Sequence, residues 1–315
     1  MQKIYLHHPY DKTQIINEPI VMALGFFDGV HLGHQRVIKT AIDEARLRGI
    51  KVAVMTFSQH PKIVYQKLDP KEMTYLSTNE RKEELFEQLG IDIMYMIDYT
   101  YDFGMQSPQT FVDDYIVAFN VEVIVAGFDY TYGKREVANM QTLPEHAKGR
   151  FEIIEIPELI LHQKKVGSSN IKDLIETGEI ETANEELGYI YQTSGVVIHG
   201  DKRGRLLGYP TANILTDDLE LIPAVGVYVV EIEVGDHWYQ GMASIGYNIT
   251  FEANRKMSCE VYILDFNQTI YGEKVKIKWH HYLRPELKFA STDDLIHQLD
   301  EDLIDTRAYF ATLGG

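Results

Sequence analysis

Short apolar runs alternate with amphipathic segments along the first 187 residues. The runs that are typical of buried strands cover residues 20–24, 52–57, 92–97 and 121–126. The segments between them that carry apolar side chains at helical spacing cover residues 33–47, 78–89 and 108–119. Strands that alternate with helices of this length form a parallel sheet with right-handed crossovers. The pattern therefore predicts an α/β domain of Rossmann-like architecture for residues 1–187.

The remainder of the chain has a different pattern. Its strand-like runs, which turn-rich segments separate, cover residues 194–199, 226–234, 238–245, 258–265 and 273–279. Only residues 292–313 have the pattern of a helix, with apolar side chains on one face. Several short strands with glycine-rich turns predict a small antiparallel β-barrel capped by this terminal helix. We therefore expect two domains, residues 1–187 and 188–315, with the break near Gly188.

The charge balance limits the partners that this chain can bind. The formal net charge of −17 argues against binding along the phosphate backbone of DNA or RNA. The negative net charge does not argue against binding of small nucleotides, because these need only a local cluster of donors or a divalent cation. No apolar run approaches the roughly 20 residues that cross a bilayer, and the N-terminus lacks a secretory signal pattern. With one cysteine, Cys259, we expect a cytoplasmic protein that binds neither nucleic acid nor membrane.

The strongest local signal in the first half is the segment Gly25-Phe-Phe-Asp-Gly-Val-His-Leu-Gly-His. It follows a predicted strand and opens a predicted helix, and His31 and His34 flank Gly33. The N-terminus of a helix offers unpaired N–H donors to an anion such as phosphate. Two imidazoles could add donors to the oxygens of a triphosphate. The alternative is a tight strand-to-helix turn with incidental histidines.

Two further motifs end other predicted strands. Thr56-Phe-Ser-Gln-His-Pro, which contains His60, ends the second strand, and Gly127-Phe-Asp-Tyr-Thr-Tyr-Gly, which contains Asp129, ends the fourth. Ligands of open α/β sheets bind beyond the carboxyl ends of the strands. The three motifs could therefore converge on one crevice, although His60 alone could equally be a turn residue.

Together these motifs resemble the adenylyltransferase module of the prokaryotic bifunctional riboflavin kinase/FAD synthetase family, within the nucleotidyltransferase superfamily. In that family the segments read approximately G-x-FDG-x-H-x-GH, TF-x-x-HP and G-x-DF-x-FG. The run at 166–172 is similar to the family's phosphate-binding Ile-Ser-Ser-Thr-x-Ile-Arg, with Gly167 and Lys172 in place of the first serine and the arginine.

The resemblance implies that FMN attacks the α-phosphorus of ATP and releases pyrophosphate, with catalytic roles for His31 and His34. It implies a flavin or phosphate contact for His60. The residues that it assigns to ATP and its phosphates are Gly25, Phe27, Asp28, Gly33, Asp129, Ser168, Ser169 and Lys172.

The second half carries the run His199-Gly-Asp-Lys-Arg-Gly-Arg-Leu-Leu-Gly-Tyr-Pro-Thr-Ala-Asn. Its glycines and basic residues form a plausible phosphate cradle, although a solvated basic hairpin would have the same composition. Thr211 and Asn213 lie two residues apart, so their side chains share a face of an extended segment. Hydroxyl and amide oxygens are hard ligands that suit Mg²⁺, although such a pair is more often turn chemistry.

This run closely resembles the riboflavin kinase family, and the resemblance implies further roles. Thr211 and Asn213 are expected to bind Mg²⁺, and Glu260 to act as the base that accepts the proton of a primary hydroxyl, unless it simply faces solvent. Arg284 is expected to contact the flavin. The residues expected at the ATP phosphates are Gly200, Lys202, Gly204, Arg205, Gly208 and Pro210. Before the catalytic strand, Ser244 and Ile249 stand where the family commonly has asparagine and proline.

The resemblance spans nearly the whole chain and implies a bifunctional enzyme. Riboflavin and ATP would give FMN, and FMN and a second ATP would give FAD, with Mg²⁺ at the phosphates. A monofunctional member of the family and a non-catalytic flavin-binding regulatory paralogue are the alternatives. Retention of both histidines, of Thr211 and Asn213 and of Glu260 argues against the non-catalytic alternative.

Overall fold

A computed structural model describes residues 1–66, 73–161, 163–200, 203–247 and 257–313. The chain divides into two compact units, Met1–Ser168 and Ser169–Gly315, which are described one at a time. No helix within these described ranges is long and apolar enough to span a membrane.

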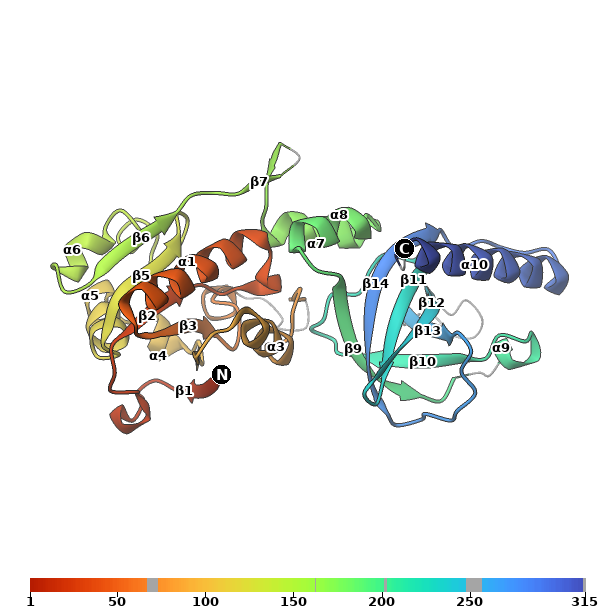
Figure 1. The fold of residues 1–315 in the computed structure, drawn as a ribbon, viewed down its shortest axis with the longest axis horizontal. Coiled ribbons are helices and arrows are strands. Elements are labelled where there is room, and N and C mark those ends of the chain that lie inside the picture. The colour runs from red at the N-terminus through yellow and green to blue at the C-terminus, as the bar shows by residue number, and fades with distance from the viewer. Residues whose placement is uncertain (67–72, 162, 201–202, 248–256, 314–315) are drawn as a thin grey trace. The chain divides into compact units, whose positions relative to one another are not determined.

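The first unit is built on a six-stranded parallel sheet with the strand order β1-β4-β3-β2-β5-β6 (Figure 1). Its strands are β1 (Gln2–Leu6), β2 (Ile20–Leu24), β3 (Lys51–Phe57), β4 (Ile93–Ile97), β5 (Val121–Gly127) and β6 (Glu152–Ile156). The central strands β2 and β4 are buried at every residue, as expected for a parallel sheet covered on both faces. The α/β architecture predicted for this half of the chain is therefore confirmed.

Helix α1 (Leu32–Arg48) packs against β2, β3 and β5. Alternate residues of β2 point the other way, into a core of aromatic side chains from the helices after β4. The longer helices of the unit are α1, α3 (Asn79–Leu89) and α6 (Leu143–Ala147), and the shorter ones are α2 (Lys62–Tyr65), α4 (Tyr101–Gly104), α5 (Pro108–Phe111), η1 (Lys12–Gln14) and η2 (Asp28–Val30). A two-stranded ribbon, β7 (Ile160–Leu161) and β8 (Lys164–Lys165), follows β6.

The edge strands and one helix of the first unit differ from the predicted elements. The edge strands β1 and β6 were not predicted, because exposed residues interrupt their apolar pattern. The single helix predicted over 108–119 is α5 followed by one wider π-helical segment, Val112–Val117. This wider turn places Tyr115 and Phe119 in the aromatic core.

The second unit contains a closed six-stranded barrel of antiparallel strands in the order β10-β13-β12-β11-β14-β9. The strands are β9 (Tyr191–Ile198), β10 (Thr211–Thr216), β11 (Gly226–Val234), β12 (His237–Tyr247), β13 (Met257–Ile263) and β14 (Lys274–Arg284). A short helix, α9 (Arg203–Leu206), lies between β9 and β10, and the terminal helix α10 (Thr292–Leu313) closes the chain (Figure 1). The predicted barrel with a terminal helix is confirmed.

Two helices precede the barrel, α7 (Ser168–Thr177) and α8 (Ile180–Leu187). Helix α8 packs against β9 and β14, where the buried Asn184 joins the two strands. The side-chain NH₂ of Asn184 donates to Trp279 O at 2.9 Å, and its side-chain carbonyl accepts from Tyr191 N at 2.7 Å.

The two compact units divide between residues 168 and 169. The functional boundary that we expect between residues 187 and 188 stays a prediction.

Replacing Asn184 by alanine is expected to destabilise the second unit by about 2–4 kcal/mol, because each orphaned buried backbone group costs about 1–3 kcal/mol. Both tryptophans, Trp238 and Trp279, lie in this unit, so the fluorescence change in a urea titration reports its unfolding alone. Glu176→Ala, on an exposed position of α7, is the matched control. An unchanged urea midpoint in Asn184→Ala would show that the two hydrogen bonds contribute little.

Candidate active sites

The loop after β2 has an unusual backbone that its surroundings hold in place. Phe27 and Val30 both have positive φ angles, 56° and 39°, which side chains other than glycine rarely adopt. The buried carboxylate of Asp28 accepts hydrogen bonds from the backbone N–H groups of Leu76, at 2.8 Å, and Ser77, at 3.3 Å. This arrangement fixes the direction in which the loop enters α1.

Two more hydrogen bonds fasten the same loop. Gly29 N donates to Ser77 Oγ at 2.9 Å, and the Ser168 hydroxyl donates to Asp28 O at 2.9 Å. The structure therefore brings Ser168 to the glycine-rich loop, as the sequence motif predicts. Since the Asp28 carboxylate is bonded to its own chain, its expected contact with ATP stays a prediction.

His31 and His34 stack at the start of α1. Their ring centroids lie 3.7 Å apart with an interplanar angle of 18°. His31 is the N-cap of α1, and its Nδ1 accepts from His34 N at 3.3 Å. A neutral His31 therefore carries its proton on Nε2, which leaves this nitrogen as a donor. Nδ1 of His34 is buried and has no hydrogen-bond partner among the described residues.

Burial keeps both histidines uncharged at neutral pH. Desolvation lowers the pKa of His31 to about 4, against an opposing effect from Asp129. Desolvation lowers the pKa of His34 well below its ordinary value, and the charges of His31 and Lys82 lower it further. The site therefore offers neutral N–H donors beside the positive end of a helix, and not two cations.

The packing around this histidine pair leaves no room for a side chain at Gly25 and little room at Gly33. A Cβ at Gly25 would lie 2.8 Å from the Phe27 ring, and one at Gly33 would lie 3.1 Å from Cε1 of His31. The Phe27 ring itself is buried and packs edge-on against His34. A ligand could therefore approach the backbone here more readily than the Phe27 side chain.

Asp129, after β5, forms an ion pair that the sequence analysis missed. Its Oδ2 lies 2.7 Å from Nζ of Lys165, which also lies 4.5 Å from the centroid of the Phe128 ring. Both charges act on the pKa of His31, in opposite directions. The basic pair 164–165, directly before the predicted phosphate-binding run, was the available signal for this lysine.

His60 lies against the glycine-rich loop. Its ring meets the Phe26 ring edge-on at 4.9 Å between centroids, and its Nδ1 accepts from Lys62 N. Its backbone N–H donates to the hydroxyl of Tyr75 at 3.2 Å. The structure thus brings the motifs after β2 and β3 together. Ser169 and Lys172 lie on α7 in the second unit, and their expected phosphate contacts stay predictions.

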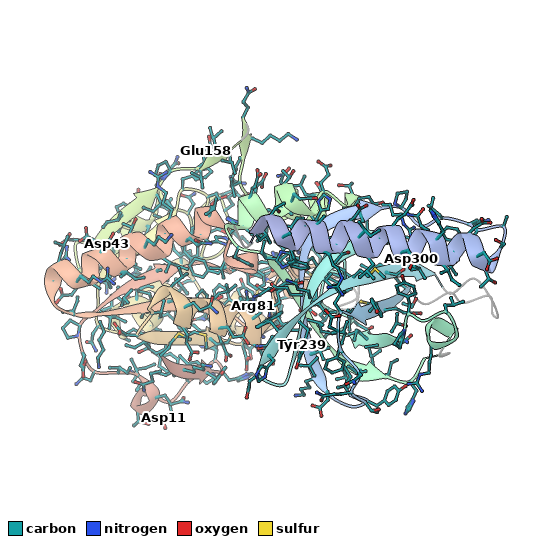
Figure 2. The ribbon with its side chains drawn as sticks, turned by 45° about the vertical axis from the view of Figure 1, so that its right-hand side comes forward. Asp11, Asp43, Arg81, Glu158, Tyr239 and Asp300 are labelled. Carbon is teal, nitrogen blue, oxygen red and sulfur yellow. The ribbon has the colours of Figure 1, made fainter. Side chains whose placement is uncertain are left out.

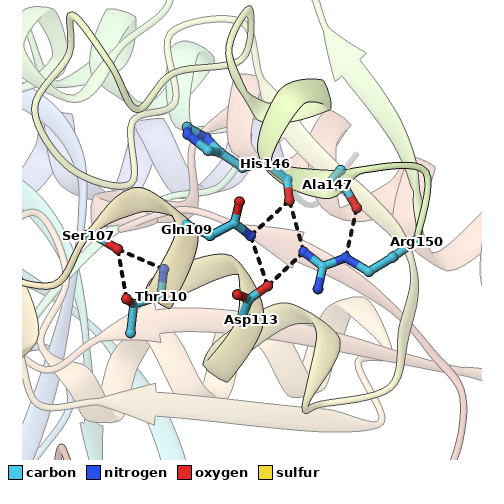
Figure 3. Close-up of polar contacts among 7 residues, drawn as sticks. All are labelled: Ser107, Gln109, Thr110, Asp113, His146, Ala147 and Arg150. Atoms are coloured by element: carbon cyan, nitrogen blue, oxygen red, sulfur yellow. Dashed lines mark hydrogen bonds and ion pairs between the residues drawn. The ribbon is translucent and has the colours of Figure 1, made fainter.

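The motifs after β3 and β5 share a cavity of about 230 Å³, which we call the aromatic cavity. Its aromatic lining is Phe57, Tyr65, Tyr99, Phe103, Phe111 and Tyr132. The Tyr132 hydroxyl lies 2.7 Å from Nδ1 of His146, on α6. Figure 3 shows how α6 is anchored, with the backbone oxygen of His146 accepting from both Gln109 and Arg150. This wall of the cavity is therefore held in position by a polar network.

In the second unit the barrel brings Thr211 and Glu260 into contact. The Thr211 hydroxyl donates to Oε2 of Glu260 at 2.9 Å. Asn213, two residues along β10, lies opposite Glu260 in the antiparallel register with β13. Ser244 of β12 lies opposite Glu260 on its other side. Three of the residues predicted for the kinase reaction therefore meet on adjoining strands.

Two glycines between β9 and β10 allow close approach, one to β10 itself and one to the residues just before it. A Cβ at Gly200 would lie 2.2 Å from Nδ2 of Asn213, and one at Gly204 would lie 2.2 Å from the carbonyl oxygen of Tyr209. Gly208 has a φ of +86°, a left-handed conformation that favours glycine. Of the other expected phosphate contacts, Lys202 lies outside the described residues.

Two cavities adjoin Thr211 in this unit. One, of about 340 Å³, is lined by Thr211, Ser244, Glu260, Tyr262, Arg284 and Leu299, and we call it the barrel cavity. The other, of about 330 Å³, is lined by Arg205, Pro210, Thr211, Phe266, Asn267 and Tyr271, and we call it the hairpin cavity. The threonine therefore stands at the junction of two cavities.

Arg284 lines the barrel cavity but is held by α10. Its Nε and one Nη donate to the buried carboxylate of Asp302 at 2.8 and 2.6 Å. Asp300 on the same helix, labelled in Figure 2, accepts from the Tyr209 hydroxyl. Both bonds tie α10 to the wall of the cavity, so the expected flavin contact of Arg284 stays a prediction.

Two family models match the chain: FAD synthetase over residues 13–170 and riboflavin kinase over residues 187–310. The chain is 51% identical to a bifunctional riboflavin kinase/FMN adenylyltransferase of Listeria monocytogenes, over 99% of each chain. It is 40% identical to the protein of the same description from Bacillus subtilis, again over 99% of each. A crystal structure described as a macrolide-efflux protein from Streptococcus pneumoniae is 36% identical, with a TM-score of 0.89 over 96% of this chain and 99% of that one.

The buried histidine pair generates a prediction about its protonation. Among the 12 histidines, the ring signals of His31 and His34 should not titrate between about pH 8 and pH 5.5, because their folded pKa values lie lower. Carbon-13 labelling of the histidine rings, with His31→Gln and His34→Gln for assignment, measures this by NMR. The unfolded chain binds these protons near pH 6.5, so the pair should destabilise the fold as pH falls below that value. A midpoint near pH 6.5 for either ring would contradict the assignment of neutral donors.

Proposed function

The chain belongs to the family of bacterial bifunctional riboflavin kinases/FMN adenylyltransferases, and we propose how its two reactions are divided among the sites described above. The enzyme phosphorylates riboflavin with ATP to give FMN, and adenylylates FMN with ATP to give FAD. Matches to both domains do not favour the monofunctional and non-catalytic alternatives. The contact between Thr211 and Glu260 at the junction of two cavities is the single observation that best supports our division.

We assign adenylylation to the first unit. The FMN phosphate attacks the α-phosphorus of ATP, the bond to the β-phosphate oxygen breaks, and pyrophosphate leaves. No protein nucleophile is needed, because the attacking phosphate is already an anion. Nε2 of His31, the N-terminus of α1 and the hydroxyl of Ser168 are our candidates to stabilise the charge that builds on the phosphates. His34, stacked on His31, fixes that ring in the donating orientation.

We assign the isoalloxazine of FMN to the aromatic cavity. Its lining offers flat apolar faces for a conjugated ring system, and its rim includes residues of the motifs after β3 and β5. The motif after β3 contacts the glycine-rich loop through His60 and Phe26, and the motif after β5 acts on His31 through the charge of Asp129. This placement would hold the FMN phosphate near the triphosphate of ATP.

We assign phosphorylation of riboflavin to the barrel. Glu260 accepts the proton of the ribityl primary hydroxyl as that oxygen attacks the γ-phosphorus of ATP, and ADP leaves. The barrel cavity, which contains Glu260, takes the flavin, and the hairpin cavity, which contains Arg205, takes the nucleotide. Thr211 lies on the line between them, where the transferred phosphoryl group must pass.

Thr211 and Asn213 are suited to hold Mg²⁺ at this junction. Groups of three histidine, cysteine or acidic side chains that could bind a metal are absent from the described part of the chain. Hydroxyl and amide oxygens beside nucleotide phosphates nonetheless match the preference of Mg²⁺, which usually takes few protein ligands. When bound, Mg²⁺ would neutralise charge on the phosphates.

The residue set and the nucleotide substrates fit a cytoplasmic enzyme that acts on small molecules.

Replacing Glu260 by glutamine should lower kcat for FMN formation by about 10²–10⁴-fold, since a positioned general base contributes about that much. FAD formation from added FMN should not change, because that reaction belongs to the first unit. HPLC of both products, from the same protein sample, measures the two rates. Glu273→Gln, on an exposed position directly before β14, is the matched control. A loss of less than tenfold would remove Glu260 from the role of base.

Replacing Thr211 by valine should raise the Mg²⁺ concentration needed for half-maximal FMN formation by roughly tenfold or more, because an oxygen ligand is lost. Thr211→Ser keeps the hydroxyl and should stay near the unmodified enzyme. Rates measured against Mg²⁺ at fixed ATP give the comparison. Equal metal dependence in the valine variant and the unmodified enzyme would argue against Thr211 as a ligand.

A further inference from the structure

Lys82, on the first turn of α3, is buried to an unusual degree for a lysine. Its side chain is only 2% exposed, although lysine almost always keeps its ammonium in water. Burial lowers the pKa of this ammonium to about 8, while the nearby carboxylates of Asp28 and Glu83 raise it. A buried charge of this kind is costly unless its surroundings are arranged around it.

The contacts of Lys82 join the two motifs that form the adenylylation site. Its ammonium donates to the carbonyl oxygen of Phe57 at 3.0 Å, at the end of β3 and the start of the motif that contains His60. It also lies 4.6 Å from the centroid of the Phe26 ring, in the glycine-rich loop after β2. The π face of this ring favours a cation at that distance.

The positive charge of Lys82 also acts on His34, one of the two stacked histidines. It is one of the causes that lower the pKa of His34, so the ammonium lies close enough for its field to reach that ring. Lys82 thus lies against the Phe26 ring of the loop, within electrostatic reach of Asp28 and His34.

The geometry points to Lys82 as a positioning residue for adenylylation, one that joins the two loops and supplies a fixed positive charge behind the histidine pair. This inference rests on the proposed division of the two activities. The charge has two consequences for the reaction. It favours the uncharged, donating form of His34, and it adds positive potential where negative charge builds on the phosphates. Since the ammonium is buried, nearby water screens it little.

A purely structural role is the competing explanation, and a pair of variants separates the two. Lys82→Gln keeps an N–H donor for the Phe57 carbonyl but removes the charge. Lys82→Met removes both the donor and the charge while preserving much of the apolar length. If the hydrogen bond alone matters, glutamine should restore the activity that methionine loses. If the charge matters, both variants should be slow.

We expect both variants to lower kcat for FAD formation from FMN by at least about tenfold, within the range measured when stabilising donors are removed from active sites. KM for FMN should change less than kcat, because Lys82 does not line the aromatic cavity. FMN formation from riboflavin, measured on the same samples, is the internal control for folded protein. Lys39→Met, an exposed lysine on α1, is the matched control for loss of a charge.

Two pH measurements give readouts that a structural role would not change. In the variants, the acid side of the rate profile for FAD formation should move toward neutral pH, because His34 loses a neighbouring cation and is protonated more easily. In the unmodified enzyme, FAD formation should fall as pH rises through about 8, where Lys82 loses its proton, whereas FMN formation should not. This second measurement tests the inference even if neither variant folds.

Three results would overturn the inference: full activity in both variants, rescue by glutamine but not by methionine, or FAD formation that is constant from pH 7 to pH 10. If the unmodified enzyme forms no FAD from FMN, the proposed function itself fails first. The two failures are therefore distinguishable.

Discussion

The carboxylate of Asp28 is the interaction on which the first unit's site depends. It accepts hydrogen bonds from two backbone N–H groups of the segment that leads into α3. The backbone carbonyl oxygen of Asp28 accepts a further hydrogen bond, from the Ser168 hydroxyl. These bonds hold a loop with positive φ at Phe27 and Val30, a conformation that would otherwise relax. The direction of α1, and therefore the placement of the histidine pair at its N-terminus, follows from that loop.

An acidic protein that binds polyanionic nucleotides must concentrate its donors locally. In the division that we propose, the first unit does this with the N-terminus of a helix and two neutral histidines. Burial strengthens the hydrogen bonds that neutral N–H donors make to an anion, because the local dielectric constant is low. The net charge of −17 therefore constrains the design of the site without excluding nucleotide substrates.

The second unit solves a related problem by close backbone approach. Gly200 lets the segment after β9 lie against Asn213 of β10 at a distance that a Cβ would forbid. The antiparallel register then places Asn213 opposite Glu260, next to Thr211. Helix α10 is tied to the same cavity through Arg284 and Asp302. A closed barrel thus holds the side chains that we propose for ligand binding on its strands.

The chain's own periodicity was sufficient to predict both folds, because an apolar pattern with period 3.6 or 2 reports directly on which face is buried. The periodicity did not predict β1 and β6, because a short and partly exposed edge strand can be identified only from its pairing with a neighbouring strand. The motifs likewise indicated the chemistry, since glycine, histidine and hydroxyl residues at fixed spacing have few uses.

Only the tertiary structure decided what those residues face. The structure shows that the Asp28 carboxylate accepts from the chain's own backbone and that Asp302 holds Arg284, while their expected contacts with ATP and flavin stay predictions. Lys82 had no distinguishing pattern, because a lysine on a helix normally faces water, and only its place in the basic pair 164–165 pointed to Lys165. Burial, partner and electrostatic field depend on segments distant in the chain, so local sequence specified the residues and the fold specified their environment.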